Sequence, residues 1–265
     1  MYLDELMYDT KLYKKGDTFY LDKLNITSGE NKLAMSGNWV LNKENSHSAF
    51  KMTASGKNNS ELLARFGISS GVQKASYSID ADLNWDGAPW SIQVNTLSGE
   101  LASRLGEGVI TGVKGAARFL GLFSIDSIIR KMKLDFRDVF DDGMAFNSIT
   151  GNGKMREGIF VSNNLTMDAV AGEMIIKGKA DLNTRLVDAE VKFTPDLTSG
   201  IPIITAFAVA PQTAIIVLAV ATAIAPVIDV ITQVNYKVEG PLESPTVKEL
   251  SRSQGEYQLP EKTEK

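Results

Sequence analysis

The stretch "LNITSGENKLAMSGNWVLN", which runs from Leu24 to Asn42, decides the fold. Apolar side chains recur at every second position around Ile26, Leu33 and Met35, and Asn, Thr, Ser and Lys stand between them. An alternation with period two places the apolar side chains on one face of a β-strand, whereas an amphipathic helix requires a period near 3.6. The stretch therefore predicts β-strands with one apolar face and one polar face.

A second stretch, "LTMDAVAGEMIIKGKADLN" from Leu165 to Asn183, repeats this pattern at the same length. The matching positions are Leu24 with Leu165, Ile26 with Met167, Leu33 with Met174, Met35 with Ile176, and Gly37 with Gly178. A repeated β unit of this kind cannot bury its apolar face alone and normally stacks on further copies of itself. The repeat therefore indicates an elongated β array.

The same alternation extends over most of the first three quarters of the chain. It recurs in "AFKMTASG", runs from Tyr77 to Trp85, and continues after the turn "WDGAP" at Trp90, Ile92 and Val94. Two alternating runs joined by a short turn predict an antiparallel pair of strands.

Two helical segments are predicted to interrupt the strands. "NSELLARFG" predicts a short helix near residues 60–67, with a serine N-cap and a glycine just past its end. Residues 112–131 predict an amphipathic helix, in which Phe119, Leu120 and Phe123 oppose lysines and arginines. Such a segment can lie in a membrane interface or cap one end of a β core, and the sequence leaves both possibilities open.

Residues 201–228 carry no charged side chain, which raises the question of a membrane span. As one helix these 28 residues would extend about 42 Å, against a hydrocarbon core of about 30 Å. Pro211 and Pro226 interrupt that helix and leave only about 21 Å between them. We expect two short apolar helices hinged at Pro211, which can dip into one leaflet, plug the end of an apolar groove or sit inside a soluble core. The expected membrane contacts of both helical segments are Phe119, Leu120, Phe123, Ile215, Ile216, Leu218 and Val220.

Composition and motifs exclude several classes of function. The chain has no cysteine, which excludes disulfides, thiolate metal sites and cysteine nucleophiles. Its net charge is −4 with both signs well mixed, so no surface for nucleic acid is predicted. "GISSG" around Ser69 fits a nucleophile elbow, but a helix precedes it and the single histidine, His47, comes before it in the chain. No catalytic residue, metal ligand or cofactor site is predicted.

Several stretches, taken together and in order, resemble a known family. They are "LNWDGAPWSI" (83–92), "LSGEL" (97–101), the segment 115–158, "MIIKGKADL" (174–182), "FTPDLTSGIP" (193–202) and "YKVEGPLESPTV" (236–247). Over about residues 62–247 they are similar to the C-terminal region of the YhdP-type AsmA-like proteins of Gram-negative envelopes. The chain departs at Ile129, Arg130 and Lys131, where the family tends to have a proline and two arginines.

The resemblance implies a bridge-like lipid-transfer protein without catalytic residues or cofactors. Members of the family are anchored in the inner membrane by an N-terminal helix and extend a long β groove across the periplasm. Phospholipid acyl chains travel along that groove toward the outer membrane. The resemblance makes this chain the distal end, which meets the inner leaflet of the outer membrane, and we expect it to be part of a longer protein.

Alternation and resemblance together predict a mainly β fold. It is an elongated, curved antiparallel sheet that forms an open apolar groove, with short amphipathic and apolar helices toward the C-terminal end. The expected segments are β groove repeats over 1–111, with the short helix near 60–67, the amphipathic segment 112–131, β groove repeats over 132–196, the apolar hairpin 197–231, a terminal strand 232–247 and a disordered tail 248–265.

The expected lipid contacts are the apolar strand residues, because acyl chains can cover an apolar face with a gain of about 25 cal/mol per Å². The predicted lining residues are Leu24, Ile26, Leu33, Met35, Ile79, Leu83, Ile92, Val94, Met167, Met174 and Ile176. The same residues would form an ordinary β-sandwich core if a second layer of protein covered them. A function of another class is also open, an envelope scaffold that binds outer-membrane assembly proteins through an exposed β edge.

Overall fold

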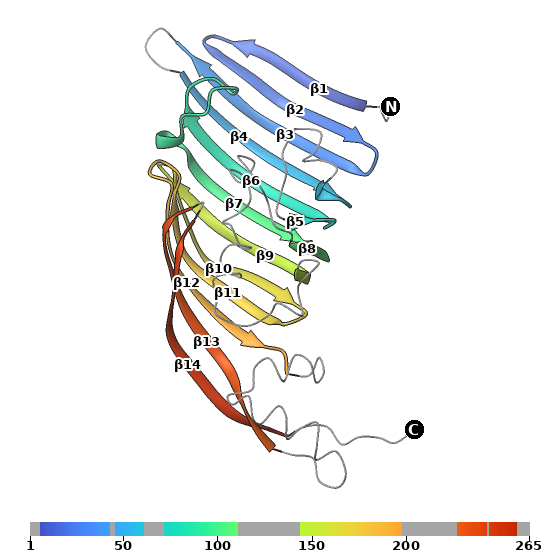
Figure 1. Cartoon of the computed structure of the whole chain (residues 1–265). Coiled ribbons are helices and arrows are strands. Elements are labelled where there is room, and N and C mark those ends of the chain that lie inside the picture. The colour runs from blue at the N-terminus through green and yellow to red at the C-terminus, as the bar shows by residue number, and fades with distance from the viewer. Residues whose placement is uncertain are drawn as a thin grey trace.

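The computed structural model describes residues 6–42, 46–60, 72–110, 144–197, 227–242 and 244–258. They form one open antiparallel sheet (Figure 1). Its strands are β1 (Leu6–Lys15), β2 (Thr18–Ser28), β3 (Asn31–Leu41), β4 (Ser46–Gly56), β5 (Val72–Gln73), β6 (Tyr77–Asp86), β7 (Ser98–Leu105), β8 (Gly108–Ile110), β9 (Met144–Arg156), β10 (Ile159–Ala169), β11 (Gly172–Asp181), β12 (Leu186–Pro195), β13 (Val227–Pro241) and β14 (Thr246–Gln258). A short 3₁₀ helix, η1 (Val94–Thr96), lies between β6 and β7.

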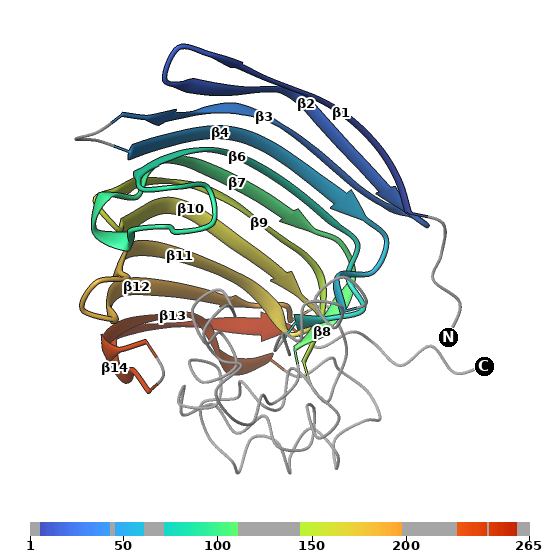
Figure 2. The same cartoon turned by 90° about the horizontal axis from the view of Figure 1, so that it is seen from above.

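The long strands follow one another across the sheet in chain order. The hydrogen-bonded order is β1-β2-β3-β4-β6-β7-β9-β10-β11-β12-β13-β14, and β5 and β8 form a side branch that joins β9. Figure 2 shows that the strands bend along their length and that the sheet curves from β1 to β14. The prediction of a mainly β, curved antiparallel sheet is confirmed. The helices expected toward the C-terminal end fall on residues outside the described ones.

The internal repeat of the sequence is also a structural repeat. Leu24 pairs with Met35 across β2 and β3, and Leu165 pairs with Ile176 across β10 and β11. A β-bulge lies just before Leu24 and another lies just before Leu165. Because a bulge sets extra residues of one strand against its partner, it bends the strand and increases its twist. The two copies therefore share both their register and the position of their bend.

Alternation along each strand gives the sheet an apolar face and a polar face. On the apolar face, a central row stands in register across β2, β3, β4, β6 and β7, and consists of Leu24, Met35, Met52, Ala81 and Leu101. On the polar face, a charged row stands in register across β4, β6, β7 and β9, and consists of Lys51, Asp82, Glu100 and Lys154. A slip of one residue in any of these pairings would exchange the two faces.

The two ends of the strands form two different rims. At the turn rim the connections are 15–18, 41–46, 86–98, 156–159, 181–186 and 241–246. At the opposite insertion rim the chain leaves and re-enters the sheet between β4 and β5, β8 and β9, and β12 and β13. Those connections contain residues 61–71, 111–143 and 198–226, which lie outside the described residues. The predicted helices near 60–67 and over 112–131, and most of the hairpin 197–231, fall within them.

The predicted strand through Trp90, Ile92 and Val94 is wrong. These residues lie in the loop between β6 and β7, where the N–H of Leu97 bonds locally to the carbonyl of Val94 at 3.1 Å. The side chains of Trp90 and Ile92 are 76% and 55% exposed. Pro89 has no N–H to give to a strand ladder, which favours a loop at this point despite the alternating residues that follow.

The predicted boundaries at the C-terminal end are also wrong. The hairpin prediction ends at residue 231 and the tail prediction begins at 248, whereas β13 begins at Val227 and β14 extends to Gln258. The predicted single terminal strand 232–247 is therefore replaced by parts of two strands. A polar sequence such as that of β14 suits an edge strand, which takes its hydrogen bonds from one neighbour and needs few apolar side chains.

Within the described part of the chain, no helix has the length and apolarity that crossing a bilayer requires.

Candidate functional site

The apolar face is the candidate functional site, because it is continuous over the sheet and part of it is accessible. Six of the predicted lining residues lie on it and are half-buried: Leu24, Ile26, Leu33, Met35, Ile79 and Leu83. Three more lie on it and are buried: Met167, Met174 and Ile176. The remaining two, Ile92 and Val94, lie in the loop between β6 and β7 and not on a strand.

Accessibility of the apolar face falls along the array. On β2, β3 and β4 its apolar side chains are half-buried, as in the central row. On β9 to β13 they are buried in one hydrophobic cluster that includes a row in register: Ile149, Met167, Met174, Phe193 and Val234. A hollow among the described residues there, beside Phe160 and Leu165, has a volume of about 20 Å³, which fits about one water-sized group. The N-terminal part of the face is therefore open, and the C-terminal part is closed.

Two glycines lie beneath aromatic rings on the apolar face. Gly37 on β3 faces Phe50 on β4, and Gly153 on β9 lies beside Phe160 on β10. A Cβ atom added at either glycine would overlap the neighbouring ring. A ring that covers a glycine in this way helps to fix strand register.

Sequence reasoning missed three residues of the apolar face: Phe50, Met52 and Leu101. The period-two alternation of their strands was a signal that could have identified them.

Aromatic side chains gather where the apolar face meets the turn rim. Phe19 stacks on Trp39 with ring centroids 5.1 Å apart, and Trp90 of the loop meets Trp39 edge-on at 5.1 Å. Phe50 and Trp85 stack at 5.8 Å. The three tryptophans of the chain therefore share one end of the strands. Sequence reasoning missed this cluster, because Trp39 and Trp90 are far apart in the chain and only the pairing of β3, β4 and β6 brings them together.

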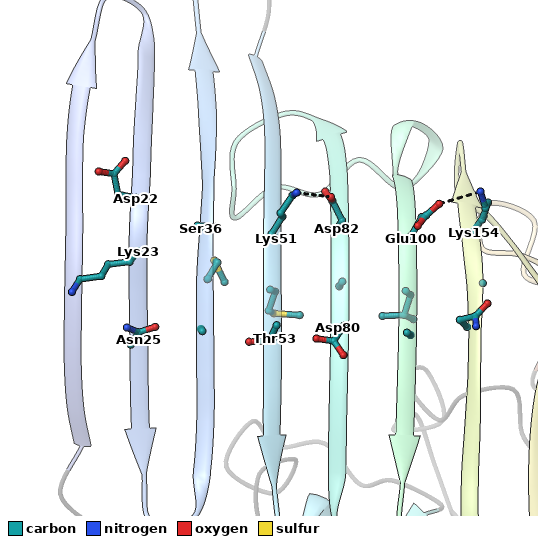
Figure 3. A pocket seen from close by; sticks show the side chains of 18 residues that line it. Asp22, Lys23, Asn25, Ser36, Lys51, Thr53, Asp80, Asp82, Glu100 and Lys154 are labelled. Atoms are coloured by element: carbon teal, nitrogen blue, oxygen red, sulfur yellow. Dashed lines mark ion pairs between the residues drawn. The ribbon is translucent and has the colours of Figure 1, made fainter.

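The polar face has a shallow trough of about 570 Å³ that crosses β2, β3, β4, β6, β7 and β9. In Figure 3, Lys51 pairs with Asp82 and Glu100 pairs with Lys154, at N–O distances of 3.5 and 3.1 Å. Such exposed pairs contribute about 0–1 kcal/mol each to stability. Covering them with hydrocarbon would remove charges from water at a cost that the buried apolar area does not offset. The trough is larger than the hollow beside Phe160 and Leu165, but its charges make it unsuitable for acyl chains.

Among the described residues, the groups considered for catalysis form no reaction centre. His47 Nδ1 lies 2.9 Å from Asp86 Oδ1, but both side chains are exposed and belong to the polar face. Ser69 lies outside the described residues. Among the residues that the structure does describe, no three His, Asp or Glu side chains are grouped closely enough to hold a metal ion.

Tyr236 on β13 belongs to the closed part of the apolar face. Its side chain is 2% exposed, and no group in the described ranges forms a hydrogen bond with its hydroxyl. Burial, together with the nearby Glu249 carboxylate, raises the pKa of Tyr236 to about 12, because both disfavour the charged phenolate. The residue stays neutral at any physiological pH.

Comparison with known proteins gives the family. The family model described as YhdP protein matches residues 8–247. A curated relative, the intermembrane phospholipid transporter YhdP of Escherichia coli (strain K12), is 29% identical over 246 residues. The alignment covers 92% of this chain and 19% of the relative, so the chain spans about a fifth of that protein's length. No solved structure matches the chain. Since the family model matches nearly the whole of the described sheet, the chain belongs to the YhdP protein family.

Proposed function

We propose that this chain is a segment of a lipid-transfer protein, in which phospholipid acyl chains move along the open part of the apolar face, on a path between the inner and outer membranes of a Gram-negative envelope. The observation that carries the proposal is the central row of β2, β3, β4, β6 and β7, which stands in register and is half-buried in all its members except Ala81. The name of the curated relative, an intermembrane phospholipid transporter, supports the same ligand. Transport of this kind needs no catalytic residue and no cofactor.

The energetics of an open apolar face favour hydrocarbon over water. Each Å² of apolar surface withdrawn from water contributes about 25 cal/mol, and both the protein and the acyl chain gain from the contact. The face has no polar group that fixes one lipid in place at the central row, so successive lipids can occupy equivalent positions. The charged row on the opposite face keeps that side of the sheet in water. One sheet can therefore be wet on one side and hold lipid on the other.

In the whole protein we place this segment in the periplasm, with the C-terminal end of the array toward the inner leaflet of the outer membrane. The anchor in the inner membrane belongs to another part of the longer protein. The expected membrane contacts, including Phe119, Phe123 and Ile216, stay proposals, because they lie outside the described residues. Other envelope proteins are further proposed partners at the membrane ends.

Site-specific photo-crosslinking in cells tests the proposal. A photoreactive amino acid replaces Met35 or Met52 on the apolar face of the full-length protein. The matched controls are Ser36 and Thr53, which neighbour those residues on the same strands but point to the polar face. We expect phospholipid adducts from the two methionine positions and background from the controls.

Two results would contradict the proposal. Equal lipid capture from both faces would mean that the protein associates with membrane without a lipid path on the sheet. Protein adducts instead of lipid adducts at Met35 would mean that another polypeptide covers the apolar face, as expected for a scaffold.

A further inference from the structure

The turn rim beside β1 to β6 joins the apolar face to a cationic and aromatic cluster. Lys14 Nζ lies 5.2 Å from the ring centroid of Phe19, and the stacked series continues from Phe19 to Trp39 and from Trp39 to Trp90. Lys14 is exposed, and no carboxylate in the described ranges forms an ion pair with it. Trp90 is 76% exposed. This is a free positive charge beside amphipathic rings, at the edge of an apolar surface.

The opposite rim of the same strands has different chemistry. There Lys57 forms an ion pair with Glu30, and the Tyr77 hydroxyl donates a hydrogen bond to Asn31 Oδ1 at 2.9 Å. These polar groups of the insertion rim are thus matched with each other. Lys32 at the same rim is also an exposed cation, but it lies on the polar face, because its neighbour Leu33 lies on the apolar face. Within the described strands β1 to β6, the turn rim is where an unpaired cation and stacked aromatic rings lie together on the apolar face.

The turn rim is also held in a fixed shape. Backbone hydrogen bonds of 2.8–2.9 Å link successive turns: Leu41 N to Asp17 O, Gly87 N to Ser46 O, Gly158 N to Leu97 O, Leu182 N to Gly158 O, and Leu242 N to Arg185 O. The indole N–H of Trp39 donates to Ser46 Oγ at 2.8 Å, which fixes the ring at the edge of the face. A binding edge that is already ordered loses little conformational entropy when a ligand arrives.

The apolar face is long enough along the strands to hold one acyl layer. Trp39 at the rim and Leu33 toward the other end of β3 are six residues apart, which is about 20 Å at about 3.3 Å per residue. Half of a hydrocarbon core of about 30 Å is about 15 Å. An acyl chain of that length that starts beside Trp39 and lies along β3 spans four to five residues, so it would pass Gly37 and end near Met35.

We propose that the turn rim holds the polar head region of the transported phospholipid, with Lys14 pairing with its phosphate and the rings of Trp39 and Trp90 against its glycerol ester region. Tryptophan suits this level, because its ring has an apolar body and a polar edge and is enriched where hydrocarbon meets water. The unpaired ammonium supplies the charge that a phosphate needs. This inference rests on the proposed function and adds the orientation of the lipid on the sheet.

Two photoreactive lipids applied to the purified full-length protein test the orientation. One is phosphatidylglycerol with a diazirine on its head group, and the other is phosphatidylglycerol with a diazirine at the end of one acyl chain. After irradiation, the adducts are mapped by mass spectrometry. We expect the head-group probe to label residues 14–19 and 88–96, and the chain-end probe to label the apolar face near Met35 and Met52.

Matched variants test the roles of the two side chains. Lys14→Gln and Trp90→Ala are each expected to lower the yield of head-group adducts by about three- to tenfold, the effect of losing one charged or aromatic contact. Lys14→Arg should keep the yield, and Lys57→Gln should leave it unchanged, because Lys57 is already paired. Both Lys14 and Trp90 are exposed, so these substitutions are compatible with folding, which a thermal melt verifies.

The outcomes separate this inference from the proposed function. If the chain-end probe labels the apolar face while the head-group probe labels the insertion rim or all regions equally, transport survives and the orientation is overturned. A loss with Lys57→Gln as large as that with Lys14→Gln would also overturn it. If neither probe labels the apolar face, the proposed function fails and this inference fails with it.

Discussion

A pair of methionine substitutions tests whether the apolar face is open in one half and closed in the other. Met35 is half-buried on β3, whereas Met167 on β10 is 1% exposed. Met35→Ala and Met167→Ala delete the same atoms from the same face, so any difference in cost reports the surroundings. Both costs refer to the protein without bound lipid.

The expected magnitudes follow from burial. At about 0.8 kcal/mol per buried methylene, removing Cγ, Sδ and Cε of a fully buried methionine costs about 2 kcal/mol in transfer free energy. The cavity left behind raises the cost of Met167→Ala to about 2–5 kcal/mol. Met35 is in contact with solvent on one side, so Met35→Ala loses about half of the transfer term and leaves no closed cavity. We expect about 1 kcal/mol or less for Met35→Ala.

Native-state hydrogen exchange measures both costs locally. Mass spectrometry of peptides from β2 and β3 reports the opening free energy around Met35, and peptides from β10 and β11 report it around Met167. Local readout is needed because a long repeated sheet need not unfold in one step. If Met35→Ala costs as much as Met167→Ala, a protein layer covers Met35 and the argument for an open lipid path is refuted.

The remaining predictions concern single side chains and glycines. Tyr236→Phe removes a buried hydroxyl without a partner in the described ranges, so it should leave stability unchanged or raise it by about 1 kcal/mol in denaturant melts. A lower stability would mean that the hydroxyl forms a hydrogen bond in the folded protein. The pKa of Tyr236 is about 12 in the folded protein and near 10 in the unfolded chain, so between these values only the unfolded chain ionises. This ionisation leaves the free energy of unfolding unchanged below about pH 10 and lowers it as the pH rises toward 12, which a phenolate absorbance titration compared with Tyr236→Phe checks. Gly99→Ala should destabilise the protein by about 3 kcal/mol or more, because φ is +139° and the new Cβ would overlap the Asp82 carbonyl oxygen. Gly16 has φ +58°, and a Cβ there would meet no atom within 4 Å, so Gly16→Ala should cost about 1–2 kcal/mol in the same melts. Asp82→Asn breaks only the exposed pair with Lys51 and should change stability by less than about 1 kcal/mol, so a larger loss would show that the charged row is coupled across strands.

Much of the sheet could be read from local sequence, because the signal of a strand is carried by neighbouring residues. Period-two alternation identified the strands around Leu24 and Met35, and the repeat at Leu165 and Ile176 predicted a second copy that has the same pairing and the same bulge. The same reasoning failed from Trp90 to Val94, where alternating residues occur in a loop. It also failed for β14, since an edge strand can be polar throughout.

The sequence by itself determined that each strand has one apolar face and that the chain has no thiol chemistry, because both depend only on residue identity and spacing. The tertiary structure alone decided that Met35 is half-buried while Met167 is enclosed, because burial depends on what packs over a face from distant parts of the chain. It also decided that Lys14, Trp39 and Trp90 meet at one rim, since strand pairing brings together residues that no local pattern connects.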